Sequence, residues 1–176
     1  TDINMEKSTL KEITSIVLPN GENIPTLDAY LAAAKRTKVH LVLELKPHAT
    51  PEAETAAAEA TVKAVEAAKL SKRVTYITFS RHAMEELIRL APKNDVLYLG
   101  GDISPEELEK LGAAGGDYNH GVYLKHPEWL EYMKQHGMIS NIWTVNHPVD
   151  MIWAMRQQID FLTTDRPDLF LQLQGK

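Results

Sequence analysis

Cysteine is absent from this 176-residue chain. Its absence excludes disulfide bonds, thiolate metal ligands and a thiol nucleophile, but it leaves the compartment open, because a protein without cysteine can work anywhere. The chain also lacks an apolar run of the roughly 18 residues that a membrane span requires, and it shows no signal peptide. We therefore expect no integral membrane span. Because the chain opens with Thr1 instead of Met, we expect that the natural N-terminus is missing, and the localisation stays open between periplasmic or secreted and cytoplasmic.

Positive charge is in the minority. The chain has 19 Lys and Arg against 24 Asp and Glu, for a formal net charge of -5. No basic run or basic face stands out, which argues against a nucleic-acid partner. An anionic substrate would therefore need a local cationic site. The hydrophobic share of 44% and the charged share of 24% are typical of one soluble globular domain, which we place at residues 1–176.

The signatures of several enzyme classes are also missing. No G-x-S-x-G nucleophile elbow is present, and no glycine-rich nucleotide-binding loop follows a predicted strand. None of the seven histidines has the H-E-x-x-H spacing of a zinc helix. Metal-assisted hydrolysis remains, with phosphate or carboxylate substrates preferred.

A regular alternation of strands and helices organises the chain. Short apolar runs predict strands at residues 39–45, 74–79, 96–99, 116–120, 139–145 and 159–163. A helix follows each strand, and one more helix precedes the first. Thr26 and Thr50 are the predicted N-caps of the first two helices, and Ser104 with Glu107 has the spacing of a capping box. Residues 1–25 are expected to hold little regular structure.

Strict alternation implies a parallel sheet with right-handed crossovers, either open and doubly wound or closed as a barrel. A complete TIM (β/α)8 barrel needs eight strands and typically about 250 residues. We predict an α/β fold of this type that is incomplete, with six strands and without the first two β/α units. Such a sheet would leave two open edges, which could pair with another copy of the chain.

The first predicted strand carries the strongest candidates for a site. Side chains two apart on a strand share a face, so Glu44 and Lys46 point the same way. In a barrel both would project inward at the C-terminal rim, where such folds keep their active sites. A carboxylate can ligate a hard divalent cation, and a lysine can bind a phosphate oxygen. A plain salt bridge at the strand end is the alternative.

Other candidates lie near later strand ends. An inward Trp143 could form a wall of a substrate pocket, although packing in the core is the simpler reading. Asn146 could orient substrate and Asp165 could be a ligand or base, but we favour helix capping for both. His48 and His120 could approach the site, whereas most other histidines are expected at the surface or at helix starts.

Four stretches together resemble the glycerophosphodiester phosphodiesterase family. Residues 21–27 (GENIPTL) resemble its G-x-x-I-P-T-L helix entry, and residues 43–46 (LELK) resemble its E-I-K strand end. Residues 142–146 (IWTVN) resemble its W-T-V-N strand, and residues 160–167 (DFLTTDRP) its closing V-D-x-I-x-T-D-x-P. Their order and spacing on an alternating β/α chain make the likeness specific.

The resemblance implies a barrel enzyme of lipid and glycerol metabolism that uses Ca²⁺ or Mg²⁺. Such an enzyme splits a glycerophosphodiester, its small-molecule partner, into glycerol 3-phosphate and an alcohol. Carried over to this chain, the resemblance implies that Glu44 is a metal ligand and Lys46 contacts the phosphate. Trp143 resembles the aromatic residue that packs on the glycerol.

The family's H-R-G motif, its E-x-D metal-binding pair and its second catalytic histidine match nothing in residues 1–25. We therefore expect both catalytic histidines upstream of Thr1, assign no catalytic residue here, and expect the isolated chain to be inactive. Two alternatives stay open. One is a non-catalytic binding or scaffold barrel, and the other is a different phosphate-ester barrel hydrolase such as a phosphoinositide-type phospholipase.

Overall fold

The computed structural model describes residues 3–175, and its centre is one parallel six-stranded sheet whose strands lie in chain order. Every neighbouring pair is parallel, as the alternation predicts. Each predicted strand is present, although five of the six are shorter than predicted and the strand predicted at residues 116–120 begins and ends one residue earlier. The strands are β1 (Leu41–Glu44), β2 (Val74–Thr78), β3 (Val96–Tyr98), β4 (Gly115–Asn119), β5 (Ile139–Trp143) and β6 (Phe161–Leu162).

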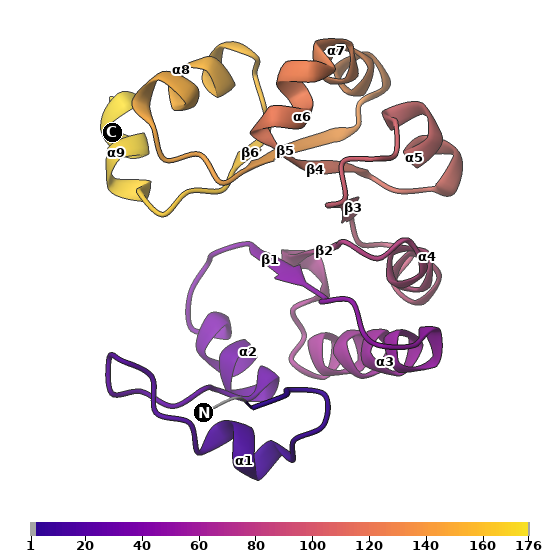
Figure 1. The fold of residues 1–176 in the computed structure, drawn as a ribbon, viewed down its shortest axis with the longest axis vertical. Coiled ribbons are helices and arrows are strands. Elements are labelled where there is room, and N and C mark those ends of the chain that lie inside the picture. Colours follow the sequence, from indigo (N-terminus) through magenta and orange to yellow (C-terminus); the bar gives the residue numbers. More distant parts are fainter. Residues whose placement is uncertain (1–2, 176) are drawn as a thin grey trace.

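Helices alternate with these strands and lie on the outer side of the arc that the strands form (Figure 1). A 3-10 turn, η1 (Ser71–Arg73), leads into β2. The α-helices are α1 (Leu10–Thr14), α2 (Leu27–Lys35), α3 (Pro51–Ala67), α4 (Arg81–Leu90), α5 (Pro105–Leu111), α6 (His120–Lys125), α7 (Pro127–His136), α8 (Pro148–Arg156) and α9 (Pro167–Leu173). The arc with its outer helices is an incomplete barrel, which confirms the predicted fold class.

Two short helices correct the sequence prediction. Within residues 1–25, Thr9 and Glu12 form a reciprocal capping box that starts α1. His120 does not end a strand but begins α6, because the Asn119 side chain accepts a hydrogen bond of 2.9 Å from the Gly121 N–H and turns the chain at once. Both helices are shorter than the apolar periods from which a helix can be predicted.

The predicted helix caps are mostly confirmed. Thr26 and Thr50 accept hydrogen bonds from the main-chain N–H groups of Ala29 and Ala53. Ser104 accepts one from Glu107, but no reciprocal bond completes the capping box. The Glu107 carboxylate instead pairs with Arg81 of α4 at 3.2 Å.

The main core lies between the sheet and the helices. Outward-facing strand residues such as Tyr76, Tyr118 and Ile142 are fully buried there. Leu41 and Leu45 are buried on the same side, so the leucines of β1 face the helices as predicted. The alternate side chains of each strand therefore point to the concave inner face.

The concave face is only partly covered. Val42, Phe79 and Phe161 expose 38–43% of their surface there. The rings of His40 and Phe161, at opposite ends of the sheet, nevertheless stack with centroids 6.4 Å apart. The sheet is therefore curled enough to bring its two edge strands toward each other, although among the described residues β1 and β6 do not pair.

A close approach between β4 and β5 requires Gly115. A Cβ atom at this position would clash with the main-chain carbonyl of Ile139. This glycine lets the two strands keep five paired positions, from Gly115 with Ile139 to Asn119 with Trp143. This pairing fixes how far along the two strands their inward-facing side chains lie relative to each other.

Within residues 3–175, no helix is both long and apolar enough to cross a bilayer.

Candidate active site

A pocket of about 350 Å³ lies at the carboxyl ends of the strands, on the concave face. This is the end at which barrels of this type carry their active sites. Glu44, Lys46 and Trp143 all line it, so the structure brings together the three residues singled out from the sequence. The other lining residues are Ile77, Phe79, Leu99, Asp117, Thr144 and Thr163.

Glu44 and Lys46 form an ion pair at the mouth of this pocket. The Lys46 Nζ lies 2.7 Å from Glu44 Oε1, with 73% of the lysine side chain and 27% of the glutamate side chain exposed. The Oε1 atom is itself buried, and the ammonium group does not lie at a hydrogen-bonding angle to it. The salt bridge that was the alternative reading therefore exists, but it leaves a buried carboxylate oxygen without an aligned hydrogen-bond donor.

The loop after β1 is held by Glu54, which the sequence reading missed. Its carboxylate accepts hydrogen bonds from the His48 N–H at 3.2 Å and from the Ser80 hydroxyl at 2.6 Å. The side chain is 6% exposed, which is rare for a glutamate and indicates a supporting role. Glu54 thus fixes the segment that follows Lys46 against the end of β2. Its place in the first turn of α3, just after Pro51, was the only signal in the sequence.

Trp143 forms one wall of the pocket instead of filling the main core. Its ring meets Phe79 edge to face, with centroids 5.6 Å apart. Its Nε1–H donates a hydrogen bond of 2.9 Å to the main-chain carbonyl of Asp117. These two contacts hold the indole ring in place at the pocket wall. The reading of Trp143 as a core residue is wrong.

Among the described residues that line the pocket, Asp117 is the one charged residue that sequence reasoning did not single out. It lies on β4, is 1% exposed, and its Oδ1 has no hydrogen-bond partner among the described residues. Burial raises the pKa of Asp117 to about 7, and the negative charge of Glu44 adds to the rise. The available signal was a charged residue at an inward position of a glycine-rich strand, Gly115–Asn119.

The capping roles favoured for Asn146 and Asp165 are wrong. The N-cap residues of α8 and α9 are His147 and Arg166, and neither makes a side-chain cap hydrogen bond. Asn146 instead donates to the Asp165 carboxylate at 2.8 Å and accepts from the Asp165 N–H at 2.9 Å. These bonds tie together the loops after β5 and β6, which pack side by side, and neither residue lines the pocket.

Neither candidate histidine lines the pocket. His48 lies at the rim, with its Nδ1 2.8 Å from the main-chain carbonyl of Lys46. His120 packs away from the pocket against Trp153, with ring centroids 4.8 Å apart, and its Nδ1 lies 3.9 Å from Asp150. As predicted, His126 and His147 precede the helix starts of α7 and α8.

The described residues make only part of a cation site. Within residues 3–175, no three His, Asp or Glu side chains gather to enclose a metal ion. Glu44 fits as one ligand, because its buried Oε1 lacks an aligned partner and faces the pocket. A calcium or magnesium ion takes six or more oxygen ligands, so the other ligands would have to come from elsewhere.

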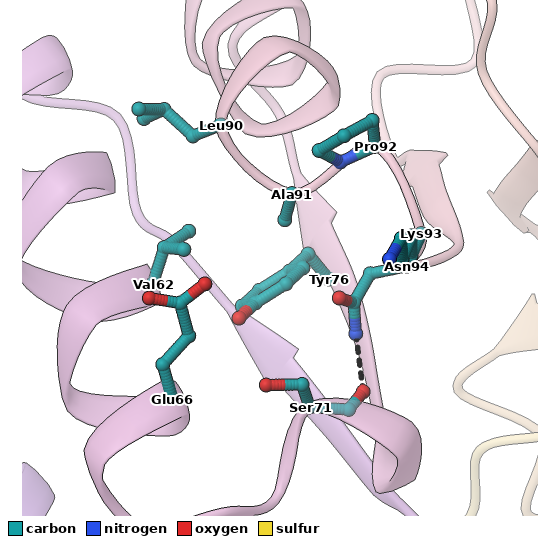
Figure 2. Close-up of a pocket in the computed structure, with 9 residues that line it drawn as sticks. All are labelled: Val62, Glu66, Ser71, Tyr76, Leu90, Ala91, Pro92, Lys93 and Asn94. Carbon is teal, nitrogen blue, oxygen red and sulfur yellow. Dashed lines mark hydrogen bonds between the residues drawn. The ribbon is translucent and has the colours of Figure 1, made fainter.

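A second hollow of about 330 Å³ lies outside the sheet, between α3, α4 and the start of β2 (Figure 2). Tyr76 points into it from the outer face, and Asn94 crosses it to bond the Ser71 carbonyl at 2.6 Å. This hollow is at the amino ends of the strands, away from Glu44. In such barrels that end supports stability, so we do not assign the chemistry to it.

The sequence profile of the glycerophosphoryl diester phosphodiesterase family matches residues 3–169. A glycerophosphodiester phosphodiesterase from Caldanaerobacter subterraneus subsp. tengcongensis is 27% identical over 122 residues, which are 67% of this chain and 49% of that protein. The chain thus spans about half the length of this curated relative.

Solved structures give the same family. A glycerophosphodiester phosphodiesterase from Parabacteroides distasonis is 44% identical, with a TM-score of 0.93 over 95% of this chain and 71% of that one. An Oleispira antarctica phosphodiesterase, solved with the product sn-glycerol-3-phosphate, shares the fold at 19% identity, with a TM-score of 0.80 over 97% of this chain and 72% of that one. With its fold, the pocket at its strand ends and a profile match over almost its whole length, this chain belongs to the glycerophosphoryl diester phosphodiesterase family.

Proposed function

We propose that the protein to which this chain belongs hydrolyses glycerophosphodiesters to glycerol 3-phosphate and an alcohol, with the help of Ca²⁺ or Mg²⁺. The main support is the meeting of Glu44, Lys46 and Trp143 in one pocket at the carboxyl ends of the strands. Family membership and the product bound by the Oleispira antarctica relative support the substrate class.

Each residue has a distinct role in this proposal. Glu44 is one ligand of the divalent cation, which when bound would neutralise phosphate charge and orient the attack. Lys46 binds a phosphate oxygen, and its exposed ammonium group can turn toward the substrate because it makes no aligned hydrogen bond to Glu44. Trp143 offers its ring face to the carbon atoms of the glycerol unit.

The reaction also needs a general acid for the leaving alcohol and a group that promotes the nucleophile. Among the described residues, those that line the pocket include no histidine. We therefore propose that residues 1–176 on their own do not turn over a phosphodiester. The same observation favours the second candidate, a binding or scaffold barrel that holds a phosphodiester without cleaving it.

Release of glycerol 3-phosphate by the complete natural protein tests the proposal. The protein is assayed on glycerophosphocholine and on a phosphoinositide, each with Ca²⁺ and with Mg²⁺. We expect cation-dependent cleavage of glycerophosphocholine that Glu44→Gln abolishes. Glu85→Gln is the matched control, because Glu85 pairs with Arg81 on the outer surface of α4 and should leave activity unchanged.

The outcomes separate the candidate functions. Binding of glycerophosphocholine without cleavage would establish the scaffold reading. Cleavage of the phosphoinositide alone would establish the phospholipase reading. Full activity in Glu44→Gln would show that Glu44 is not a ligand of the cation.

A further inference from the structure

Asp117 is a buried carboxyl group in the pocket to which the proposed mechanism assigns no role. It lies on the inner face of β4, opposite Asn141 of β5, and only 1% of its surface is exposed. It shares the pocket with Glu44 and Trp143. A group in this position is destabilising unless it has a partner outside the described residues.

Residues 3–175 do not satisfy this carboxyl group. Asp117 Oδ1 is buried and has no hydrogen-bond donor among the described residues. The indole N–H of Trp143, a donor beside it, is already used by the main-chain carbonyl of Asp117. Buried polar atoms are nearly always paired, and an unpaired one costs roughly 1–3 kcal/mol. The missing donor is therefore expected from a ligand in the pocket.

The walls around Asp117 indicate what kind of ligand supplies that donor. Ile77, Phe79, Leu99 and Trp143 give apolar and aromatic surface, and Asp117 is the buried polar side chain among them. A short polyol matches this arrangement, because its C–H faces pack on aromatic rings while its hydroxyls bond to a carboxyl group. A quaternary ammonium group has no N–H to donate.

We propose that Asp117 is a substrate-binding residue that recognises a hydroxyl of the glycerol unit. The inference rests on the proposed function and adds the direction in which the substrate lies. The phosphate stays at the mouth with Lys46, the glycerol unit extends inward between Trp143 and Asp117, and the leaving alcohol points outward. The pocket then recognises the glycerol end of the diester and makes few contacts with the leaving alcohol.

A binding experiment with the complete natural protein tests this inference without turnover. Calorimetry compares glycerol 3-phosphate with propyl phosphate, which has the same carbon chain and phosphate but no hydroxyl. The wild type should prefer glycerol 3-phosphate by about tenfold, which corresponds to one hydrogen bond of roughly 1.4 kcal/mol. Asp117→Ala should bind both ligands equally, with the affinity for propyl phosphate unchanged. Asp117→Asn, which keeps the size and hydrogen-bonding ability, should retain part of the preference.

Asp160→Asn is the matched control. Asp160 is an exposed aspartate that accepts hydrogen bonds from Ser140 at the amino ends of the strands, away from the pocket, so its loss should leave the preference intact. The inference is overturned if Asp117→Ala keeps the tenfold preference or weakens both ligands equally. It is also overturned if Asp117→Ala lowers affinity for Ca²⁺ while keeping the preference, since Asp117 would then be a cation ligand. An active Glu44→Gln variant would refute the cation role in the proposed function and leave these binding results standing.

Discussion

Replacing Asp117 by Asn should stabilise the protein, by an amount that depends on pH. Burial and the charge of Glu44 raise the pKa of Asp117 from its ordinary value of 3.8 to about 7. Between these two values the folded state binds a proton that the unfolded state does not bind. Stability conferred by the wild-type residue is therefore greatest below pH 4 and falls as the pH rises toward 7.

The size of the effect follows from the shift. Each pKa unit corresponds to 1.36 kcal/mol, so a shift of about three units corresponds to roughly 4 kcal/mol at and above neutral pH. Asn has nearly the same volume and no titratable group. The free energy of unfolding of Asp117→Asn minus that of the wild type should therefore grow by roughly 4 kcal/mol from pH 4 to pH 7 and then level off.

Urea unfolding followed by circular dichroism at several pH values between 4 and 8 measures this difference. EDTA in every sample keeps cations from binding near Glu44 and altering the charge that Asp117 meets. Taking the difference between the two proteins cancels the titration of all other groups. Parallel stability curves for the two proteins over this range would show that Asp117 ionises normally, and the account of a buried, unpartnered carboxyl group would be wrong.

Two further predictions concern the phosphate contact and the core. Lys46→Met keeps the aliphatic stem but removes the charge. In steady-state assays, KM for a glycerophosphodiester should therefore rise roughly tenfold to a hundredfold, with no loss of thermal stability. An unchanged KM would exclude the phosphate contact. Leu87→Ala, at a fully buried position of α4, should cost about 2–5 kcal/mol in urea unfolding. Leu124→Ala, where 56% of the side chain is exposed, should change stability by less than about 0.5 kcal/mol, and similar losses in both would contradict the described packing.

The fold could be predicted because the sequence signals for its strands and helices are local and periodic. Buried parallel strands such as Val74–Thr78 are short apolar runs, and caps such as Thr50 mark where the next helix starts. The inward direction of Glu44 and Lys46 followed from the two-residue period of a strand. Helix α6 was missed because it follows β4 with no intervening loop, so that no boundary signal separates them.

The site was predictable only in part, since its remaining features depend on contacts between distant residues. Asn146 and Asp165 each had the sequence position of a helix cap, but they bond to each other across 19 residues. Glu54 looked like an ordinary first-turn glutamate until its contacts with His48 and Ser80 were seen. The burial of Asp117 depends on the curvature of the whole sheet, which no local pattern encodes.

The position of a bound product tests the central claim most directly. We predict that crystals of the complete natural protein soaked with glycerol 3-phosphate will show the phosphate beside Lys46 and the glycerol carbons on the ring of Trp143. Glycerol 3-phosphate bound in the hollow between α3 and α4, with the pocket at Glu44 empty, would contradict the assignment of the active site.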